Sequence, residues 1–172
     1  MTASNTFPTG LVSPDVAASI SGFDFLVALR DGTLIAPPFS ATTAIRPIEI
    51  SSGRVAFEGT PSEEFYNPMG LVHGGWIVTL LDTAMACAIH SMLPAGTTYT
   101  TLELKTNFVR PVYASTGVLR CEGVVLSFGG RIASSEGKVY DKVGNLVAHG
   151  SETCLIMGRR NGAAQADTQG ER

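Results

Sequence analysis

The sequence has few charged residues and no basic cluster. Only 16% of its 172 residues are Asp, Glu, Lys or Arg, against about 25% in an average soluble domain. Its 12 Lys and Arg are outnumbered by 15 Asp and Glu, which gives a formal net charge of −3. A chain without a basic patch has no electrostatic footprint for a nucleic-acid backbone, so neither DNA nor RNA is expected as a partner. The low charge also leaves little polar material to cover a monomer, so self-association is expected.

Cysteine is scarce too, and no apolar run is clean enough for a membrane span. The three cysteines, Cys87, Cys121 and Cys154, lie far apart in apolar sequence. This spacing fits neither a disulfide framework nor a metal site, so three buried thiols are expected. The longest apolar run, residues 74–93, carries Asp82 at its centre and predicts a helix buried in protein. No signal-like segment opens the chain, so a cytoplasmic location with no membrane partner is expected.

Several motifs that would identify a chemistry are absent from the sequence. No glycine-rich nucleotide-binding fingerprint is present, which leaves phosphoryl and hydride transfer without support. No Gly-x-Ser-x-Gly element is present either, and no Ser or Cys has a motif-placed His and Asp. A hydrolase triad is therefore not expected.

The patterned segments predict one long helix, a shorter lead-in helix and six strands. The long helix is expected over about residues 73–92, because Pro94 and Gly96 then end it. The lead-in helix is expected over about residues 13–31, where Ser-Pro-Asp precedes apolar residues at helical spacing. Period-two patterns joined by short links predict the strands. These are residues 41–51, 54–60, 98–112, 116–128, 131–141 and 146–157.

This order predicts an α+β domain in which an antiparallel sheet of about six strands buries one long helix on its concave face. In the strand at 98–112 one face is expected to pack against the core. That face carries Leu102, Leu104, Thr106 and Phe108. The chain is expected to divide into an N-terminal tail and helical lead-in at 1–40, the sheet-and-helix domain at 41–157, and a disordered C-terminal tail at 158–172.

The stretch from Asn67 to Asp82 carries most of the chemical information. Gly74 and Gly75 begin the long helix and leave its first amides uncovered by side chains, which favours an oxyanion. Alternatively, the two glycines only let the helix approach the sheet closely. Asp82 lies eight residues beyond Gly74 on an otherwise apolar helix, where an uncompensated carboxylate is costly. It is expected to open onto a cleft as a base or nucleophile, or else to be satisfied by Thr79 or a strand amide.

The polar residues beside this stretch also allow structural roles. Asn67 precedes a proline and is typical of a loop turn, and His73 at a helix start is typical of a cap. Neither residue indicates catalysis when taken alone. His90 and His149 have no partner spacing and are expected to be structural or surface groups.

Taken together, these residues resemble one known family. The segments Asn67-Pro-Met-Gly and His73-Gly74-Gly75, Asp82 nine residues after the histidine, and the run TTLELKTNFVRPV at 100–112 are similar to the hotdog-fold acyl-CoA thioesterases. The phenylacetic-acid-degradation branch is the most similar, and the resemblance spans about residues 19–157. It implies a hotdog thioesterase domain at 41–157 that hydrolyses an acyl- or aryl-acyl-CoA thioester to free acid and coenzyme A.

The resemblance also implies roles for the matching positions. The Gly74 amide polarises the thioester carbonyl, and Asp82 acts as general base or nucleophile across a dimer interface from that helix end. Asn67 helps to orient the thioester or the attacking water. His73 mostly shapes the helix entry.

Two positions leave the water-binding arrangement open. Thr101 falls near a Ser or Thr that holds the nucleophilic water in some members, but Thr100 matches equally well. Some aryl-CoA members also place a Thr one turn beyond the acid, where this chain has Ala86. The acid is Asp rather than Glu, so its reach is one methylene shorter.

The expected acyl-CoA substrate needs few groups. A thioester is an activated acyl donor, so one helix-end amide and one carboxylate suffice, and no metal or cofactor is expected. Gly75 is expected to contact the substrate, and Arg110 and Arg131, with Lys105 and Lys138 behind them, to bind the coenzyme phosphates. Apolar residues around the long helix could line the acyl slot, namely Phe65, Tyr66, Trp76, Ile77, Leu80, Leu81 and Met85.

Two other functions on the same fold stay open. A non-catalytic acyl-CoA-binding or sensing protein usually carries a DNA-binding segment, for which residues 1–40 offer no basic recognition helix. A hydratase or dehydratase needs a catalytic His set against the acid, and the thioesterase motif explains His73 better. A homodimer, or more readily a homotetramer, is expected because one helix on one sheet leaves the far face and an edge uncovered.

Overall fold

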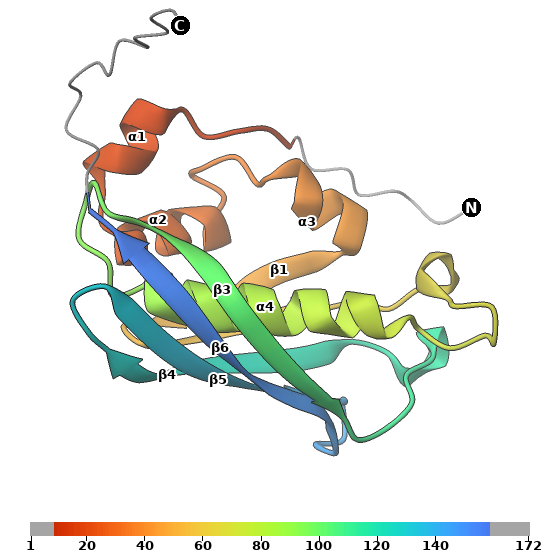
Figure 1. Ribbon diagram of the computed structural model, residues 1–172. Coiled ribbons are helices and arrows are strands. Elements are labelled where there is room, and N and C mark those ends of the chain that lie inside the picture. The colour runs from red at the N-terminus through yellow and green to blue at the C-terminus, as the bar shows by residue number, and fades with distance from the viewer. Residues whose placement is uncertain (1–8, 159–172) are drawn as a thin grey trace, which may run out of the picture.

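The computed structural model describes residues 9–158, and its centre is a six-stranded antiparallel sheet that curves around one helix (Figure 1). Residues 1–8 and 159–172, which belong to the N-terminal and C-terminal tails expected from the sequence, lie outside the described residues. The strands lie in the order β1-β2-β4-β5-β6-β3, so β1 and β3 are the edges and the predicted hotdog architecture is confirmed. Their bounds are β1 (Ile45–Ser51), β2 (Arg54–Gly59), β3 (Thr98–Phe108), β4 (Leu119–Phe128), β5 (Ile132–Tyr140) and β6 (Leu146–Met157).

The central helix, α4 (Gly74–His90), packs against the concave face of the sheet (Figure 1). Its first turn is capped by His73, whose Nδ1 accepts a hydrogen bond from the Gly75 N–H at 2.9 Å. The sheet approaches the helix so closely that a Cβ at Gly123 on β4 would lie 2.2 Å from the carbonyl oxygen of Ala84. Glycine is therefore required at this contact.

Three short helices precede the sheet, where the sequence predicted one helix over residues 13–31. α1 (Pro14–Ser19) and α2 (Gly22–Arg30) are separated because Ile20 is extended, with φ −121° and ψ 156°. The Ser21 hydroxyl then caps α2 by accepting from the Asp24 N–H at 3.1 Å. The third, α3 (Pro38–Thr43), occupies the start of the first expected strand. The prediction of a single lead-in helix is therefore wrong.

The lead-in packs against the C-terminal end of α4. The Gly22 N–H donates to the Leu93 carbonyl at 2.9 Å, and a Cβ at Gly22 would lie 1.8 Å from the carbonyl oxygen of His90. Figure 1 shows α1, α2 and α3 together on one side of α4, with β4 and β5 on the other. Among the described residues, no helix is long and apolar enough to cross a membrane.

The edge strand β3 contains an irregularity that redirects its side chains. Its pairing with β6 shifts register between Thr101 and Glu103, so Leu102 leaves the packed face and is 56% exposed. Phe108, at the end of the strand, is 55% exposed. The prediction that Leu102 and Phe108 pack against the core is therefore wrong, and Thr101 turns toward α4 instead.

Candidate active site

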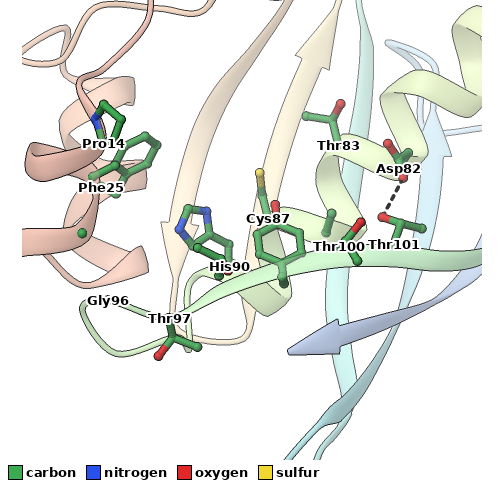
Figure 2. A pocket seen from close by; sticks show the side chains of 15 residues that line it. Pro14, Phe25, Asp82, Thr83, Cys87, His90, Gly96, Thr97, Thr100 and Thr101 are labelled. Carbon is green, nitrogen blue, oxygen red and sulfur yellow. Dashed lines mark hydrogen bonds between the residues drawn. The ribbon is translucent and has the colours of Figure 1, made fainter. Parts of the chain in front are cut away.

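Asp82 is half-buried in the middle of α4, opposite the start of β3. Its Oδ1 lies 3.3 Å from Thr101 Oγ1, so the threonine hydroxyl can donate to it (Figure 2). Burial raises the pKa of the Asp82 carboxyl, and the Thr101 hydrogen bond partly opposes this rise. Of the two threonines left open by the sequence, Thr101 is the one that contacts the acid. The alternative in which Thr79 satisfies Asp82 is not observed, because no hydrogen bond between the two is found among the described residues.

A cavity of about 680 Å³ opens beside Asp82. The lead-in helices α1 and α2 form one wall, and α4 with the start of β3 forms the other (Figure 2). Its lining includes Ala18, Phe25, Ala86, Cys87, His90 and Tyr99. This is the largest hollow described next to the carboxylate, and its walls are mainly apolar. The residues that the sequence suggested for an acyl slot do not line this cavity. Those on α4 are buried in the core, namely Trp76, Ile77, Leu80, Leu81 and Met85, and Phe65 and Tyr66 pack against that core.

His90 lines this cavity and packs against two aromatic side chains. Its ring centroid lies 5.4 Å from that of Phe25 and 5.3 Å from that of Tyr99. Burial lowers the pKa of the imidazole to about 4, so His90 is neutral at physiological pH. His90, which was expected to be a structural or surface group, packs against Phe25 and Tyr99 in the wall of the cavity.

The three cysteines are buried or partly buried, as expected, and Cys87 lines the cavity. Burial raises the pKa of the Cys87 thiol to about 12, and burial with the neighbouring Glu152 does the same for Cys154. Both thiols are therefore protonated at neutral pH, which makes them poor nucleophiles and poor metal ligands. Among residues 9–158, no three His, Cys, Asp or Glu side chains are grouped to hold a metal ion.

A second carboxyl group stands behind Asp82, and sequence reasoning missed it. Glu152 on β6 is 1% exposed, and its Oε1 lies 2.7 Å from Thr101 Oγ1. The Cys154 thiol donates to the same oxygen at 3.0 Å. Glu152 lies on the inward face of β6 together with Cys154 and Ile156. An acid on an otherwise apolar face is the feature of the sequence that could have identified it as a buried polar residue.

The N-terminal end of α4 forms a separate small hollow of about 360 Å³. It brings together Asn67, Gly74 and Arg110, and the exposed ring of Phe108 lies beside them. The Gly75 N–H is already bonded to His73, whereas the Gly74 N–H donates to no described group. Of the two amides expected to be uncovered, only that of Gly74 is available.

Asn67 holds the loop that enters α4. Its Oδ1 accepts from the Met69 N–H at 2.9 Å and from the Leu71 N–H at 3.2 Å. These bonds are the loop-turn role that its position before a proline predicts. The side-chain oxygen is therefore committed to the loop, and the amide nitrogen is the part that can donate to a ligand.

One chain does not bring the predicted site residues together. Gly74 and Asp82 are eight residues apart on one helix, or about 12 Å along its axis. Arg110 follows β3 beyond the pairing of Phe108 with Ala148, whereas Arg131 precedes the pairing of Ile132 with Leu155 near the other end of β6. The site is therefore split into an acid half and a helix-end half, and Arg131 lines neither cavity.

Comparisons with known proteins agree with this architecture. The Thioesterase superfamily model matches residues 69–148. A protein of Saccharolobus solfataricus described provisionally as an esterase is 33% identical to this chain over 113 residues. The aligned residues are 66% of this chain and 79% of that protein. The structure of a phenylacetic acid degradation-related protein of Ralstonia eutropha JMP134 is 26% identical, with a TM-score of 0.70 over 76% of this chain and 98% of that one.

A third similar structure shares the fold at lower identity. It is smu.793 of Streptococcus mutans UA159, solved bound to acetyl CoA, which is 22% identical with a TM-score of 0.61 over 67% of this chain and 90% of that one. The family match, the sequence relative and the topology of the sheet lead to one assignment. The chain belongs to the thioesterase superfamily of hotdog-fold proteins.

Proposed function

We propose that this protein hydrolyses acyl-CoA thioesters to a free acid and coenzyme A. The observation that carries the proposal is the half-buried Asp82 carboxylate, which lies within hydrogen-bond distance of Thr101 at the mouth of a largely apolar cavity. The coenzyme is suggested by the Streptococcus mutans neighbour, whose structure contains acetyl CoA. Membership of the thioesterase superfamily supports a hydrolase in general.

The reaction needs the two halves of the site to meet. An oxyanion donor and a base must both lie within a few ångströms of one carbonyl carbon, which about 12 Å along α4 does not allow within one chain. A second copy that pairs along the free edge of β3 would bring its Gly74 toward Asp82. Exposed apolar residues on and after this edge, Leu102, Phe108 and Val109, favour such a contact. We therefore propose a homodimer with composite sites, which can pair further into a tetramer.

Each site residue then has a defined task. Asp82 accepts a proton from water as the water attacks the thioester carbonyl. In the alternative route Asp82 attacks the carbonyl itself, the thiolate leaves, and water then hydrolyses the resulting mixed anhydride to the free acid. The negative charge that develops on the carbonyl oxygen is stabilised by the Gly74 N–H and the positive end of α4. The carbon–sulfur bond then breaks and the coenzyme leaves as a thiolate. Asn67 orients the reacting groups, and His73 holds the helix entry in place.

The cavity beside Asp82 suits the acyl group. Its far end consists of the neutral aromatic rings of Phe25, His90 and Tyr99, which favour an uncharged aryl or medium-length alkyl chain. Arg110 shares the smaller hollow with Gly74 and is placed to attract coenzyme phosphates.

The test is a hydrolysis screen over acetyl-, medium-chain, phenylacetyl- and benzoyl-CoA, followed by release of free thiol. Asp82→Asn keeps the side-chain size but removes the base, so kcat should fall by about 10²–10⁴ with the fold intact. A wild-type protein that hydrolyses none of these thioesters, or an Asp82→Asn variant with normal turnover, would contradict the proposal.

The alternatives on this fold have less support. Among the described residues no histidine forms a hydrogen bond with Asp82, which disfavours a hydratase or dehydratase that pairs the two. A non-catalytic acyl-CoA sensor would bind thioesters without releasing thiol, so the same screen separates it from an enzyme.

A further inference from the structure

Glu152 is a fully buried acid that the proposed reaction does not use. It is 1% exposed, and it takes part in none of the ion pairs described. Its Oε2 is buried and has no hydrogen-bond partner among the described residues. A carboxylate in this position would carry an unpaired charge in the protein interior, which is among the most costly arrangements in a folded chain.

Within residues 9–158, no neighbour of Glu152 supplies a compensating positive charge. The titratable or polar groups that face Glu152 come from all four surrounding elements. They are Asp82 and Cys87 on α4, Tyr99 and Thr101 on β3, Cys154 on β6, and Ser135, which lies opposite Glu152 across the β5–β6 ladder. None of these groups can carry a positive charge, and burial raises the pKa values of the two thiols and the phenol, which keeps those three groups neutral.

The Thr101 hydroxyl contacts two carboxyl groups, and it can donate to Asp82 only if it does not donate to Glu152. A hydroxyl has one proton, yet Thr101 Oγ1 lies within reach of Glu152 Oε1 at 2.7 Å and of Asp82 Oδ1 at 3.3 Å. If Glu152 were ionised, the shorter contact would take the proton and Asp82 would have no donor. If Glu152 is protonated on Oε1, it donates to Thr101, and the Thr101 proton is free to point at Asp82.

We propose that Glu152 is a positioning residue for the catalytic carboxylate: it is a neutral carboxylic acid that donates to Thr101, and Thr101 in turn donates to Asp82. This inference rests on the proposed function for its kinetic consequence, but the protonated Glu152 is a property of the folded chain itself. The relay runs from β6 through β3 to α4, so three elements fix the hydroxyl beside the reacting acid.

The electrostatics of the cluster point the same way. Burial raises the pKa of the Glu152 carboxyl, and the nearby Asp82 charge raises it further, while the Cys154 and Thr101 contacts oppose the rise. The two acids also differ in exposure, because Asp82 is half-buried at the cavity and Glu152 behind it is fully buried. In the proposed relay, Asp82 is therefore the group that ionises, and Glu152 holds the proton.

The kinetic test compares Glu152→Gln with Glu152→Leu on the best substrate of the hydrolysis screen. The glutamine amide can still donate to Thr101, so kcat should stay within about twofold of the wild type, whereas leucine lacks a donor and should lower kcat about five- to tenfold at unchanged KM. Combining Glu152→Leu with Thr101→Val should cost no more than Thr101→Val alone, because Glu152 acts through that hydroxyl. Glu136→Gln, at an exposed acid on β5 away from the β3 edge and from both cavities, is the matched control and should have no effect.

The second test needs no activity. The Glu152 side chain ionises near pH 4.5 in the unfolded chain but stays protonated in the folded one, so rising pH should favour unfolding of the wild type relative to Glu152→Gln. The ratio of their unfolding constants should rise about tenfold per pH unit between pH 5 and 7. A carboxylic-acid carbonyl band in the infrared spectrum at pH 7 should be present in the wild type and Glu136→Gln and absent from Glu152→Gln.

The outcomes separate the two proposals. Equal losses of kcat in Glu152→Gln and Glu152→Leu, or no loss in either, would overturn the positioning role. A flat or falling ratio of unfolding constants, or an infrared band that Glu152→Gln retains, would overturn the neutral acid. If the wild type hydrolyses no thioester, the proposed function fails, while the unfolding and infrared results still decide whether Glu152 is protonated.

Discussion

The Thr101 hydroxyl lies 3.3 Å from Asp82 Oδ1, across the gap between the edge strand β3 and the central helix α4. A donor in this position stabilises the ionised form of the acid and so lowers its pKa, against the effect of burial. The ionisation of Asp82 at a given pH therefore depends on a residue of a different element.

Replacing Thr101 with valine keeps the shape of the side chain and removes the donor. The pKa of Asp82 should then rise, which moves the acid limb of the kcat/KM profile to higher pH and lowers kcat about tenfold at neutral pH. Thr100→Val is the matched control, because Thr100 is exposed and does not bond to Asp82. An unchanged acid limb in Thr101→Val would mean that the threonine does not act on the acid.

The buried imidazole of His90 should make the protein sensitive to acid. Its pKa is about 4 when folded and 6.5 when unfolded, so below pH 6.5 protons bind the unfolded chain preferentially and stability falls as the pH drops toward 4. The loss attributable to His90 can reach about 3 kcal/mol. Between pH 7 and pH 4.5, the free energy of unfolding measured with denaturant should fall less for His90→Gln than for the wild type. His149→Gln is the control, because His149 lies on β6 away from the cavity, and it should lose as much stability as the wild type.

The contact between Gly123 and Ala84 predicts a strong effect of one methyl group. Gly123→Ala places a Cβ 2.2 Å from the Ala84 carbonyl oxygen, so α4 and β4 must separate. We expect a loss of about 1–3 kcal/mol, or failure to fold. Gly130→Ala meets nothing within 4 Å and should be nearly neutral by the same chemical denaturation.

A composite site predicts complementation between inactive subunits. Asp82→Asn and Gly74→Val should each abolish most activity, but a mixed dimer has one site in which both groups are intact, so mixing and reassociation should restore a substantial fraction. If mixed dimers, identified by mass spectrometry, recover no activity, each chain works alone and the composite site is contradicted.

The β3 edge should be the surface on which the copies pair. Leu102→Asp puts a charge on this edge and should give a smaller particle in light scattering together with loss of hydrolysis. Leu126→Asp, on β4 and similarly exposed at 58%, should leave assembly and activity unchanged. An active Leu102→Asp monomer would contradict the dimer.

Arg110 beside Gly74 is expected to bind the nucleotide end of the substrate. Arg110→Ala should raise KM for acyl-CoA several-fold and change little for a short thioester without the nucleotide. Arg131 was predicted with it from the sequence, but it lines neither cavity, so Arg131→Ala should have the smaller effect. Equal changes for both thioesters would point to a structural role.

The sequence predicted the fold well, for physical reasons. A 17-residue apolar helix with one carboxylate and six segments of period-two pattern allow few arrangements other than a sheet around a helix. The spacing from His73 to Asp82 likewise placed the cap and the acid on the same helix.

The missed features depend on contacts between distant segments. The bulge at Leu102 arises from pairing with β6, and nothing in the local pattern of β3 encodes it. Glu152 lies about 50 residues from Thr101 in the chain, and only the β3–β6 register brings them together. The lead-in was misread because one extended residue, Ile20, interrupts a pattern that continues at helical spacing beyond it.

The wall that α1 and α2 contribute to the cavity has a consequence for how this protein can change. The family model matches residues 69–148, which include Gly74, Asp82 and Thr101, whereas the lead-in helices lie wholly outside that segment. Under the proposed function, one wall of the acyl cavity is thus encoded outside the stretch that carries the hydrolytic groups. We expect substitutions at Ala18 or Phe25 to change the range of substrates while those groups stay untouched.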